Sequence, residues 1–414
     1  METRSPQTFT GYETFVIVIL AFILFTVMLD FMVLSPLGNI LMTSMKLSPQ
    51  QFGSVVSAYA ISACVSGFLT AGFADKYDRK KLLLFFYTGF IIGTLFCALA
   101  NSYSTLLAAR IFTGVFGGVI GSISMAIVTD LFALEQRGKV MGLIQMAFAG
   151  SQILGIPLGL WMATRWGWHS TFFAIVIVAV FTGIAVVVRL KPVNEHLKIQ
   201  NSKSPLLHLW HTVRKKDYRT GFVAIMLLSM GGFMIAPFSS DFYVNNVKIR
   251  MEDVPVIFMC SGIASVFIMP VIGKLSDRFD KLGMFIFGTV IACIMVVIST
   301  NLGPTPLWEV VVINVLMFVG IMSRMVPSQA LNSAIPDAAD RGAYMSINSS
   351  LQQLAGGLGA ISAGFIVVKA DATSPLQHFN TLGYVMVGIM LLCIFLMWRV
   401  SRMVKAKMAK RTGV

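Results

Sequence analysis

The chain has 414 residues, of which 56% are hydrophobic and 12% are charged, and its mean hydropathy is +0.80. Soluble domains carry about 25% charged residues, so this composition excludes a soluble globular protein and indicates an integral membrane protein. The formal net charge of +14 fits cationic loops beside anionic lipid, and nucleic acid is not an expected partner.

Twelve apolar runs are long enough to cross a hydrocarbon core, which needs about 20 residues. The polar residues 1–10 before the first run lack the features of a cleaved signal peptide, so we expect them to be retained. The sequence therefore predicts an all-α membrane protein with twelve transmembrane helices in two pseudo-symmetric bundles of six. We place these spans at 14–38, 51–73, 82–100, 105–128, 140–163, 169–189, 220–243, 254–275, 283–300, 307–332, 343–368 and 380–400.

The distribution of Lys and Arg predicts the orientation, because cytoplasmic loops retain positive charge. With the N-terminus inside, 25 of the 32 Lys and Arg residues fall in cytoplasmic segments. An even number of spans then predicts that both termini are cytoplasmic. The five cysteines lie in apolar runs without C-x-x-C spacing, and we interpret them as core residues.

A polar linker, residues 190–218, separates residues 1–189 from residues 219–414. Within it, Ser204 and Pro205 precede an apolar stripe, which predicts an amphipathic helix on the membrane surface; a disordered tether is the alternative. The two parts share loop signatures. AGFADKYDRKK after span 2 matches GKLSDRFDKLG after span 8, and EQRGKVMGL before span 5 matches ADRGAYMSI before span 11. The chain is thus predicted to be a parallel repeat of six spans.

These segments resemble motifs of the major facilitator superfamily. ADKYDRKK is similar to the conserved loop G-x-x-x-D-[RK]-x-G-[RK]-[RK], LLAARIFTG resembles the span 4 motif with a lone Arg, and GSQILGIPLG resembles the Gly-Pro motif of proton-driven exporters. Residues 324–357 are similar to sugar-efflux permeases. The resemblance covers the whole chain and implies a transporter of the bacterial drug or sugar-efflux branch.

Three positions depart from the family pattern. Ala71 stands where the loop has its first Gly. Asp78 stands where the loop has its second Gly, and Asp tolerates a left-handed backbone, so we expect the turn to be kept. Ile156 separates Gly155 from Pro157, which weakens the exporter motif.

The charged loop after span 2 predicts a breakable contact at the cytoplasmic ends of the two halves. The resemblance implies that Asp75 lies near the start of span 11 and that Arg79 bridges Asp75 to Asp130. Alternatively, the basic residues of this loop only enforce topology. The matching positions complete the predicted cytoplasmic gate, which consists of Asp75, Arg79, Asp130, Arg137, Asp277 and Arg341.

Asp30 is the one carboxylate placed well inside a predicted span. Counting residues from the span ends puts it at nearly the same depth as Arg110 in span 4. Because a buried charge is costly unless it is paired, we expect these side chains to meet, and we interpret the pair as the proton-coupling site. A purely structural salt bridge is the alternative.

A substrate cavity is expected at the midplane between the halves. Arg324 is predicted to share one layer with Gln352 and Gln353 and to bind an anionic or carbonyl group, with Gln352, Asn348 and Asn332 as hydrogen-bond partners. Alternatively, it extends its head group to the cytoplasmic face. Methionines of span 7 offer an adaptable wall or simple packing. The other candidate substrate-binding residues are Tyr59, Gln145, Gln152, Met230 and Phe233.

Phosphate-binding, zinc-protease and serine-hydrolase motifs are absent from the sequence, so we expect no enzymatic activity, cofactor or metal. The sequence favours a monomeric, proton-coupled exporter of small amphipathic molecules in a bacterial inner membrane. The alternatives are a proton-coupled importer of an organic anion that uses Arg324, and a membrane receptor that does not transport.

Overall fold

A computed structural model describes residues 9–70, 73–194, 197, 211–337, 340–371 and 374–412. Within these residues the regular structure is helical, apart from one isolated bridge between Val368 and Gln377. The α-helices are α1 Gly11–Val33, α2 Gly38–Ser44, α3 Pro49–Thr70, α4 Arg79–Leu99, α5 Tyr103–Leu131, α6 Leu134–Gly150, α7 Ile156–Trp166, α8 His169–Arg189, α10 Lys216–Asn245, α11 Val254–Arg278, α12 Lys281–Thr300, α13 Leu307–Ser333, α14 Arg341–Ile366 and α15 Phe379–Thr412.

Ten helices of the described part of the chain are long and apolar enough to cross a membrane. The region predicted as span 5 is divided by a π-helical turn, Ser151–Gly155, which joins α6 to α7. The region predicted as span 11 is α14, a helix of 26 residues whose Asn348, Gln352 and Gln353 lower its hydropathy. The multi-span membrane architecture is confirmed, and the count of twelve stays a prediction.

Local sequence explains where several helices begin. Thr10 and Glu13 form a capping box at the start of α1, and Ser102 forms another with Thr105 at the start of α5. Asp78 caps α4 and Asp280 caps α12 in the same way, because each carboxylate accepts a backbone N–H three residues ahead. These two caps occupy matching positions of the sequence repeat.

Asp78 does not adopt the left-handed backbone that its place in the loop motif suggested. Its φ is −55° and its ψ is 127°, which are ordinary values for a residue that precedes a helix. The side chain replaces the family's Gly by bonding to the first turn of α4, and the loop therefore needs no residue with positive φ at this position.

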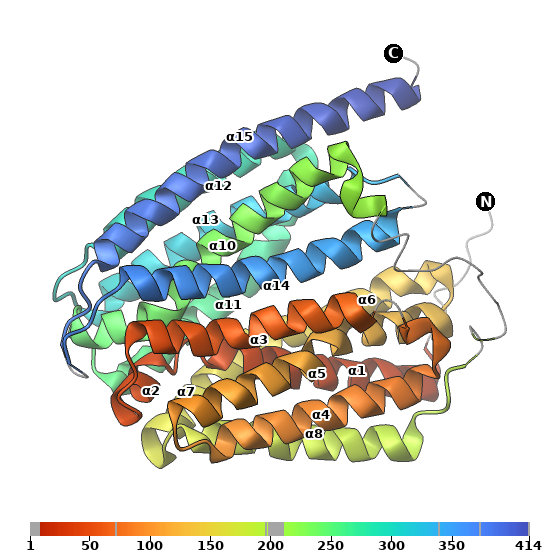
Figure 1. Ribbon diagram of the computed structural model, residues 1–414. Coiled ribbons are helices and arrows are strands. Elements are labelled where there is room, and N and C mark those ends of the chain that lie inside the picture. Colours follow the sequence, from red (N-terminus) through yellow and green to blue (C-terminus); the bar gives the residue numbers. More distant parts are fainter. Residues whose placement is uncertain are drawn as a thin grey trace.

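The helices lie roughly side by side in a single bundle (Figure 1). Helices α1 to α8, from the first part of the chain, group on one side of it, and α10 to α15 group on the other, with α3 and α14 adjacent between them (Figure 1). We refer to these groups as the N-half and the C-half. The domain boundaries at residues 189 and 219 stay predictions, and most of the predicted linker helix, residues 201–210, lies outside the described residues.

Glycines allow α3 and α14 to approach closely. A Cβ added to Gly53 would lie 2.7 Å from the carbonyl oxygen of Ala360, and one added to Gly364 would lie 2.7 Å from that of Pro49. Backbones in this contact leave no room for a side chain. The two halves are therefore tightly packed near the end of the bundle where α3 begins.

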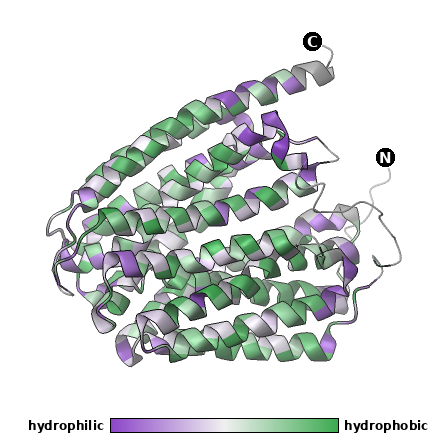
Figure 2. Ribbon diagram, in the orientation of Figure 1, coloured by the Kyte–Doolittle hydropathy of each residue, from purple (hydrophilic) through white to green (hydrophobic). Residues whose placement is uncertain are grey.

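We call the end of the bundle where α1 begins and α15 ends the terminal face, and the end that carries α2 the opposite face. Hydrophobic residues cover the helix lengths, while hydrophilic residues are concentrated toward these two faces (Figure 2). Large apolar side chains such as Phe181, Phe267 and Phe365 are at least 70% exposed. A belt of this kind is the surface that lipid would cover.

Candidate functional site

The centre of the candidate site is an ion pair buried within the N-half. Arg110 on α5 donates from Nη1 to Oδ2 of Asp30 on α1 at 2.7 Å. Their side chains are 1% and 0% exposed. Thr94 on α4 donates its hydroxyl to the second oxygen, Oδ1, at 3.3 Å. The structure thus brings together the two side chains that their depths in the sequence predict to meet, and three helices hold the carboxylate in place.

Arg110 has a second contact, with an aromatic ring. Its guanidinium carbon lies 4.6 Å from the centre of the Tyr59 ring, a cation–π geometry that links the ion pair to α3. Its Nε is buried and has no hydrogen-bond partner among the described residues. The Arg110 guanidinium thus contacts both the Asp30 carboxylate and the Tyr59 ring, so a movement that changes one contact also changes the other.

From Tyr59 a row of aromatic rings crosses to the C-half. The Phe31 ring on α1 lies 5.3 Å from Tyr59 and 5.6 Å from Phe233 on α10, measured between ring centres. Phe233 in turn lies beside α14, since a Cβ on Gly356 would come within 3.1 Å of its ring. We call Tyr59, Phe31 and Phe233 the aromatic row. It joins two predicted substrate residues: Tyr59 lies against Arg110 of the ion pair, and Phe31 connects Tyr59 to Phe233.

Sequence reasoning missed Phe31 and Thr94. Phe31 directly follows Asp30, and a large aromatic residue beside a buried carboxylate was the available signal. Thr94 carried no comparable signal, because its contact with Asp30 depends on how α4 packs against α1.

Among the described residues, no hydrogen bond joins Arg324 to Asn332, Asn348 or Gln352, and a common polar layer stays a prediction. Asn332 donates to Asn348 at 3.0 Å and accepts a hydrogen bond from Tyr344 at 2.6 Å, so these amides bind other partners than the guanidinium. Arg324 is 3% exposed, and its guanidinium lies 5.5 Å from the Phe285 ring on α12. It is buried within the C-half and does not extend to a membrane surface.

The remaining substrate candidates lie in several places. Gln352 and Met230 are half-buried, and the side chain of Gln145 lies outside the described residues. The main chain of Gln152 packs on α11, where a Cβ on Gly262 would lie 3.1 Å from its carbonyl oxygen. The binding role of these residues stays a prediction.

Part of the predicted gate is present at the terminal face. Arg79 donates from Nε to Asp130 Oδ2 at 3.2 Å, and these side chains are 9% and 19% exposed. Arg137 donates to the carbonyl oxygens of Phe132 and Thr129, so it satisfies the end of α5. Arg341 is exposed at the start of α14, and the side chains of Asp75 and Asp277 lie outside the described residues.

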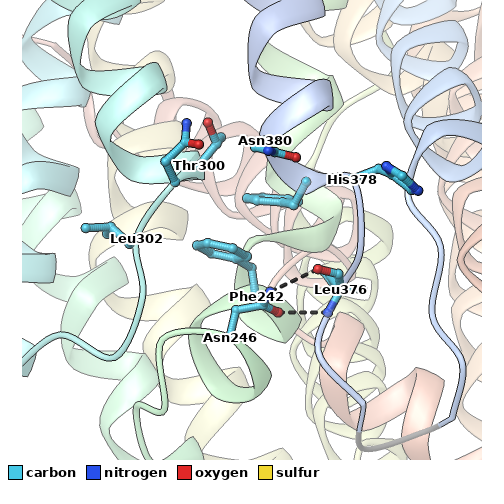
Figure 3. Close-up of a pocket in the computed structure, with 9 residues that line it drawn as sticks. Phe242, Asn246, Thr300, Leu302, Leu376, His378 and Asn380 are labelled. Carbon is cyan, nitrogen blue, oxygen red and sulfur yellow. Dashed lines mark hydrogen bonds between the residues drawn. The ribbon is translucent and has the colours of Figure 1, made fainter.

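A small open pocket lies elsewhere, between the ends of α10, α12 and α15 at the opposite face (Figure 3). Its volume is about 200 Å³, and its lining includes Phe242, Asn246, Thr300 and His378. It contains none of the predicted substrate residues. The ion pair and the aromatic row, and not this pocket, form the candidate transport site.

The family profile of the Major Facilitator Superfamily matches residues 20–244 and, a second time, residues 221–412. The chain belongs to this superfamily. Membership confirms the resemblance drawn from the loop motifs, and it identifies the protein as a membrane transporter and not an enzyme.

Relatives with known names point to the same family. Multidrug resistance protein 2 of Bacillus subtilis is 25% identical over 69% of this chain and 72% of its own length. An uncharacterized MFS-type transporter of the same species, YbcL, is 24% identical over 81% of this chain and 83% of its own. Multidrug resistance protein fnx1 of Schizosaccharomyces pombe is 30% identical over 43% of this chain, and the match spans only 33% of fnx1.

Solved structures confirm the fold. A bacterial homologue of the human lysosomal transporter Spinster, in an inward-facing unoccupied conformation, superimposes with a TM-score of 0.78 at 15% identity and covers 96% of this chain and 99% of its own. A D-xylose–proton symporter superimposes with a TM-score of 0.75 at 15% identity, covering 94% and 98%.

Proposed function

We propose that this chain exports small amphipathic molecules with an aromatic part, in exchange for protons, by alternating access. The proposal also makes the terminal face cytoplasmic, because Lys and Arg are concentrated in the loops at that end. The single observation that carries it is that Arg110 contacts both Asp30 and Tyr59, the first member of the aromatic row. One guanidinium thereby joins a group that can take up a proton to a surface that can bind an aromatic substrate.

The chemistry follows from the charge balance at Arg110. When Asp30 is ionised, the carboxylate neutralises the guanidinium and holds it at the N-half. When a proton binds Asp30, Arg110 loses its counter-charge in a low-dielectric site and must find another partner, such as the Tyr59 ring or water. The aromatic row then changes shape or becomes hydrated, and the bound substrate is released.

Asp30 is sealed from solvent in the present conformation, with 0% of its side chain exposed. Proton exchange therefore requires a second conformation in which water reaches the pair. A transporter that alternates between two openings supplies such a conformation, and a rigid receptor does not. This reasoning favours transport over the receptor alternative.

The importer of organic anions depended on Arg324 facing the same space as Gln352. The guanidinium lies against Phe285 on α12 instead, within the C-half. The multidrug-resistance names of several relatives also support amphipathic substrates. We therefore favour efflux of amphipathic molecules over uptake of an anion.

The test is exchange in proteoliposomes, with ethidium as a fluorescent aromatic cation and an imposed pH gradient. The parent protein should move ethidium against its gradient, and Phe31→Leu should weaken this movement by removing the central ring of the row. Phe96→Leu is the matched control, because Phe96 is 50% exposed on the lipid-facing surface. Ethidium movement that ignores the pH gradient would refute proton coupling, and equal effects of the two substitutions would refute the role of the row.

A further inference from the structure

A second buried carboxylate lies near the opposite face, outside the candidate transport site. Asp241, close to the end of α10, has a side chain that is 0% exposed. Its Oδ1 accepts from Lys369 Nζ at 2.7 Å and from Asn245 Nδ2 at 2.9 Å. Lys369 is itself only 3% exposed along its side chain. The C-half therefore contains a fully formed ion pair at the membrane boundary, where exposed charges would ordinarily be hydrated.

The loop that carries Lys369 is fixed to α10. Val368 and Gln377 exchange two backbone hydrogen bonds, of 3.2 and 2.9 Å. Asn246 holds the same loop through both polar atoms of its side-chain amide: Nδ2 donates to the Leu376 carbonyl at 2.9 Å, and Oδ1 accepts from the Leu376 N–H at 2.8 Å (Figure 3). Because these bonds lie within the C-half, the pair of Asp241 and Lys369 should persist when the two halves separate.

One member of the cluster comes from the N-half. Asn39 on α2 donates from Nδ2 to the same Oδ1 of Asp241 at 2.7 Å, and its backbone N–H donates to the Ser240 hydroxyl at 3.3 Å. The neighbouring residue, Gly38, packs so closely that a Cβ there would lie 2.6 Å from the Pro237 carbonyl oxygen. Asn39 therefore binds the buried carboxylate only while the opposite face is closed.

The two oxygens of Asp241 are used unequally. Oδ1 receives all three donors, whereas Oδ2 is buried with no hydrogen-bond partner among the described residues. A buried carboxylate oxygen without a donor is a costly arrangement, and a proton on that oxygen would remove the charge that makes it costly. The geometry leaves one position open for a proton.

We propose that Asp241 is a second proton-binding group, and that its ionised form, through Asn39, holds the opposite face closed. This inference rests on the alternating access of the proposed function but does not require coupling at Asp30. A proton from the outer solution binds Oδ2, and the neutral acid bonds more weakly to Asn39. Lys369 is left without a counter-charge in a dry site, so opening to water becomes favourable.

The groups around Asp241 do not offer another explanation for such a response. Asn39 faces it from α2, Ser240 and Asn245 belong to α10, and Lys369 is the charged side chain that contacts it among the described residues. Tyr243 is close in sequence, but its hydroxyl accepts a hydrogen bond from Asn314 on α13. Acidification from outside would therefore act on this closure through the carboxyl group.

The experiment measures how readily the opposite face opens. Ser57 is 2% exposed on α3, and its carbonyl oxygen would lie 3.2 Å from a Cβ on Gly357 of α14. We would introduce Ser57→Cys, treat intact cells with a membrane-impermeant maleimide, and subtract the labelling of the parent with its native cysteines. Exposed Lys46, replaced by Cys, gives the labelling rate of an open site on the same face and corrects for the effect of pH on the reagent.

Asp241→Asn and Asn39→Ala should each raise the labelling rate of Ser57→Cys about tenfold or more, because each weakens a hydrogen bond to a charged group. Asn39→Ala leaves the ion pair of the C-half intact, so it gives a result even if Asp241→Asn fails to fold. The matched control is Asp253→Asn, which breaks the exposed pair of Arg250 and Asp253 in the following loop and should change nothing. Acid outside should also raise labelling in the parent and not in Asp241→Asn.

Unchanged labelling in both Asp241→Asn and Asn39→Ala would overturn the inference, and so would a full acid response in Asp241→Asn. Failure of Lys46→Cys to react from outside would instead refute the proposed orientation. Because labelling requires no substrate and no pH-driven exchange, the inference can fail while the exporter proposal survives, and the reverse is also possible.

Discussion

Replacement of Asp30 by Asn tests the proton-coupling site most directly. The substitution keeps the shape of the side chain and the hydrogen bond from Thr94, but it removes the negative charge that lies 2.7 Å from Arg110. Both side chains are at most 1% exposed, so water cannot hydrate the unpaired guanidinium unless the helices rearrange. Removing one partner of such a pair costs about 3–5 kcal/mol.

This loss of folding free energy is larger than the loss expected when the hydrogen bond from Thr94 to Asp30 is removed. Thr94→Val removes a hydrogen bond of 3.3 Å to the same carboxylate, which is worth about 1.5 kcal/mol. The thermal unfolding temperature in detergent should therefore fall clearly for Asp30→Asn and only slightly for Thr94→Val. The double variant Asp30→Asn/Arg110→Gln leaves no uncompensated charge, and it should recover most of the lost stability.

The assay that separates stability from function is ethidium exchange driven by a pH gradient in proteoliposomes. The double variant should be folded and yet unable to couple exchange to the gradient, because it has no group at this site that takes up a proton. If Asp30→Asn unfolds at the parent temperature and still responds to the gradient, then the pair is neither strongly coupled nor the site of proton uptake.

Three further outcomes are expected. Arg79→Gln should increase maleimide labelling of a cysteine introduced between the two halves near the terminal face, measured in inside-out vesicles, because it breaks the bond to Asp130. Unchanged labelling would leave the basic loop with only a topological role. Gly53→Ala should raise the outside labelling of Ser57→Cys, since its Cβ would lie 2.7 Å from the Ala360 carbonyl oxygen; Gly11→Ala, with no atom within 4 Å, is the control. The hydrogen bond from Lys405 lowers the pKa of Asp280 below its ordinary value of 3.8. The ionised carboxylate therefore stabilises the fold at pH values above 3.8, and this stabilisation is lost as the pH falls through the lowered pKa. Accordingly, the unfolding temperatures of parent and Asp280→Asn should differ at about pH 7 and converge near about pH 2; a constant difference would contradict this.

Counting residues along spans predicted depth well, and this was enough for Asp30 and Arg110. Both lie on helices that face each other within the N-half, so equal depth led to contact. The same count does not decide whether Arg324 and Gln352 share a cavity, because depth along a helix does not fix which side of the helix a residue occupies. Arg324 turns toward Phe285 on α12, a direction that depends on how α13 packs against α12.

Residues near helix ends were harder to interpret from sequence. Asp78 occupies a glycine position of the family loop, which favours a turn with positive φ. The Asp78 side chain instead caps α4, and its backbone angles are ordinary. Asp241 lies near the end of the predicted span 220–243, where a carboxylate is ordinarily hydrated. Its burial depends on Asn39 and Lys369, which are far from it in the chain, so no local pattern could reveal it.

The π-helical turn Ser151–Gly155 has a consequence for how this chain tolerates changes in length. A π turn accommodates a residue more than an α turn does, and here the widened backbone brings the Gln152 carbonyl against α11 while Ser151 donates to the Phe25 carbonyl of α1. Deleting a single residue from this turn would allow one uninterrupted α-helix to form. The extra residue is contained in the widened turn, so α6 and α7 would keep nearly the same faces toward their neighbours after this deletion. The same deletion within the regular part of α6 or α7 would instead rotate everything beyond it by about 100°.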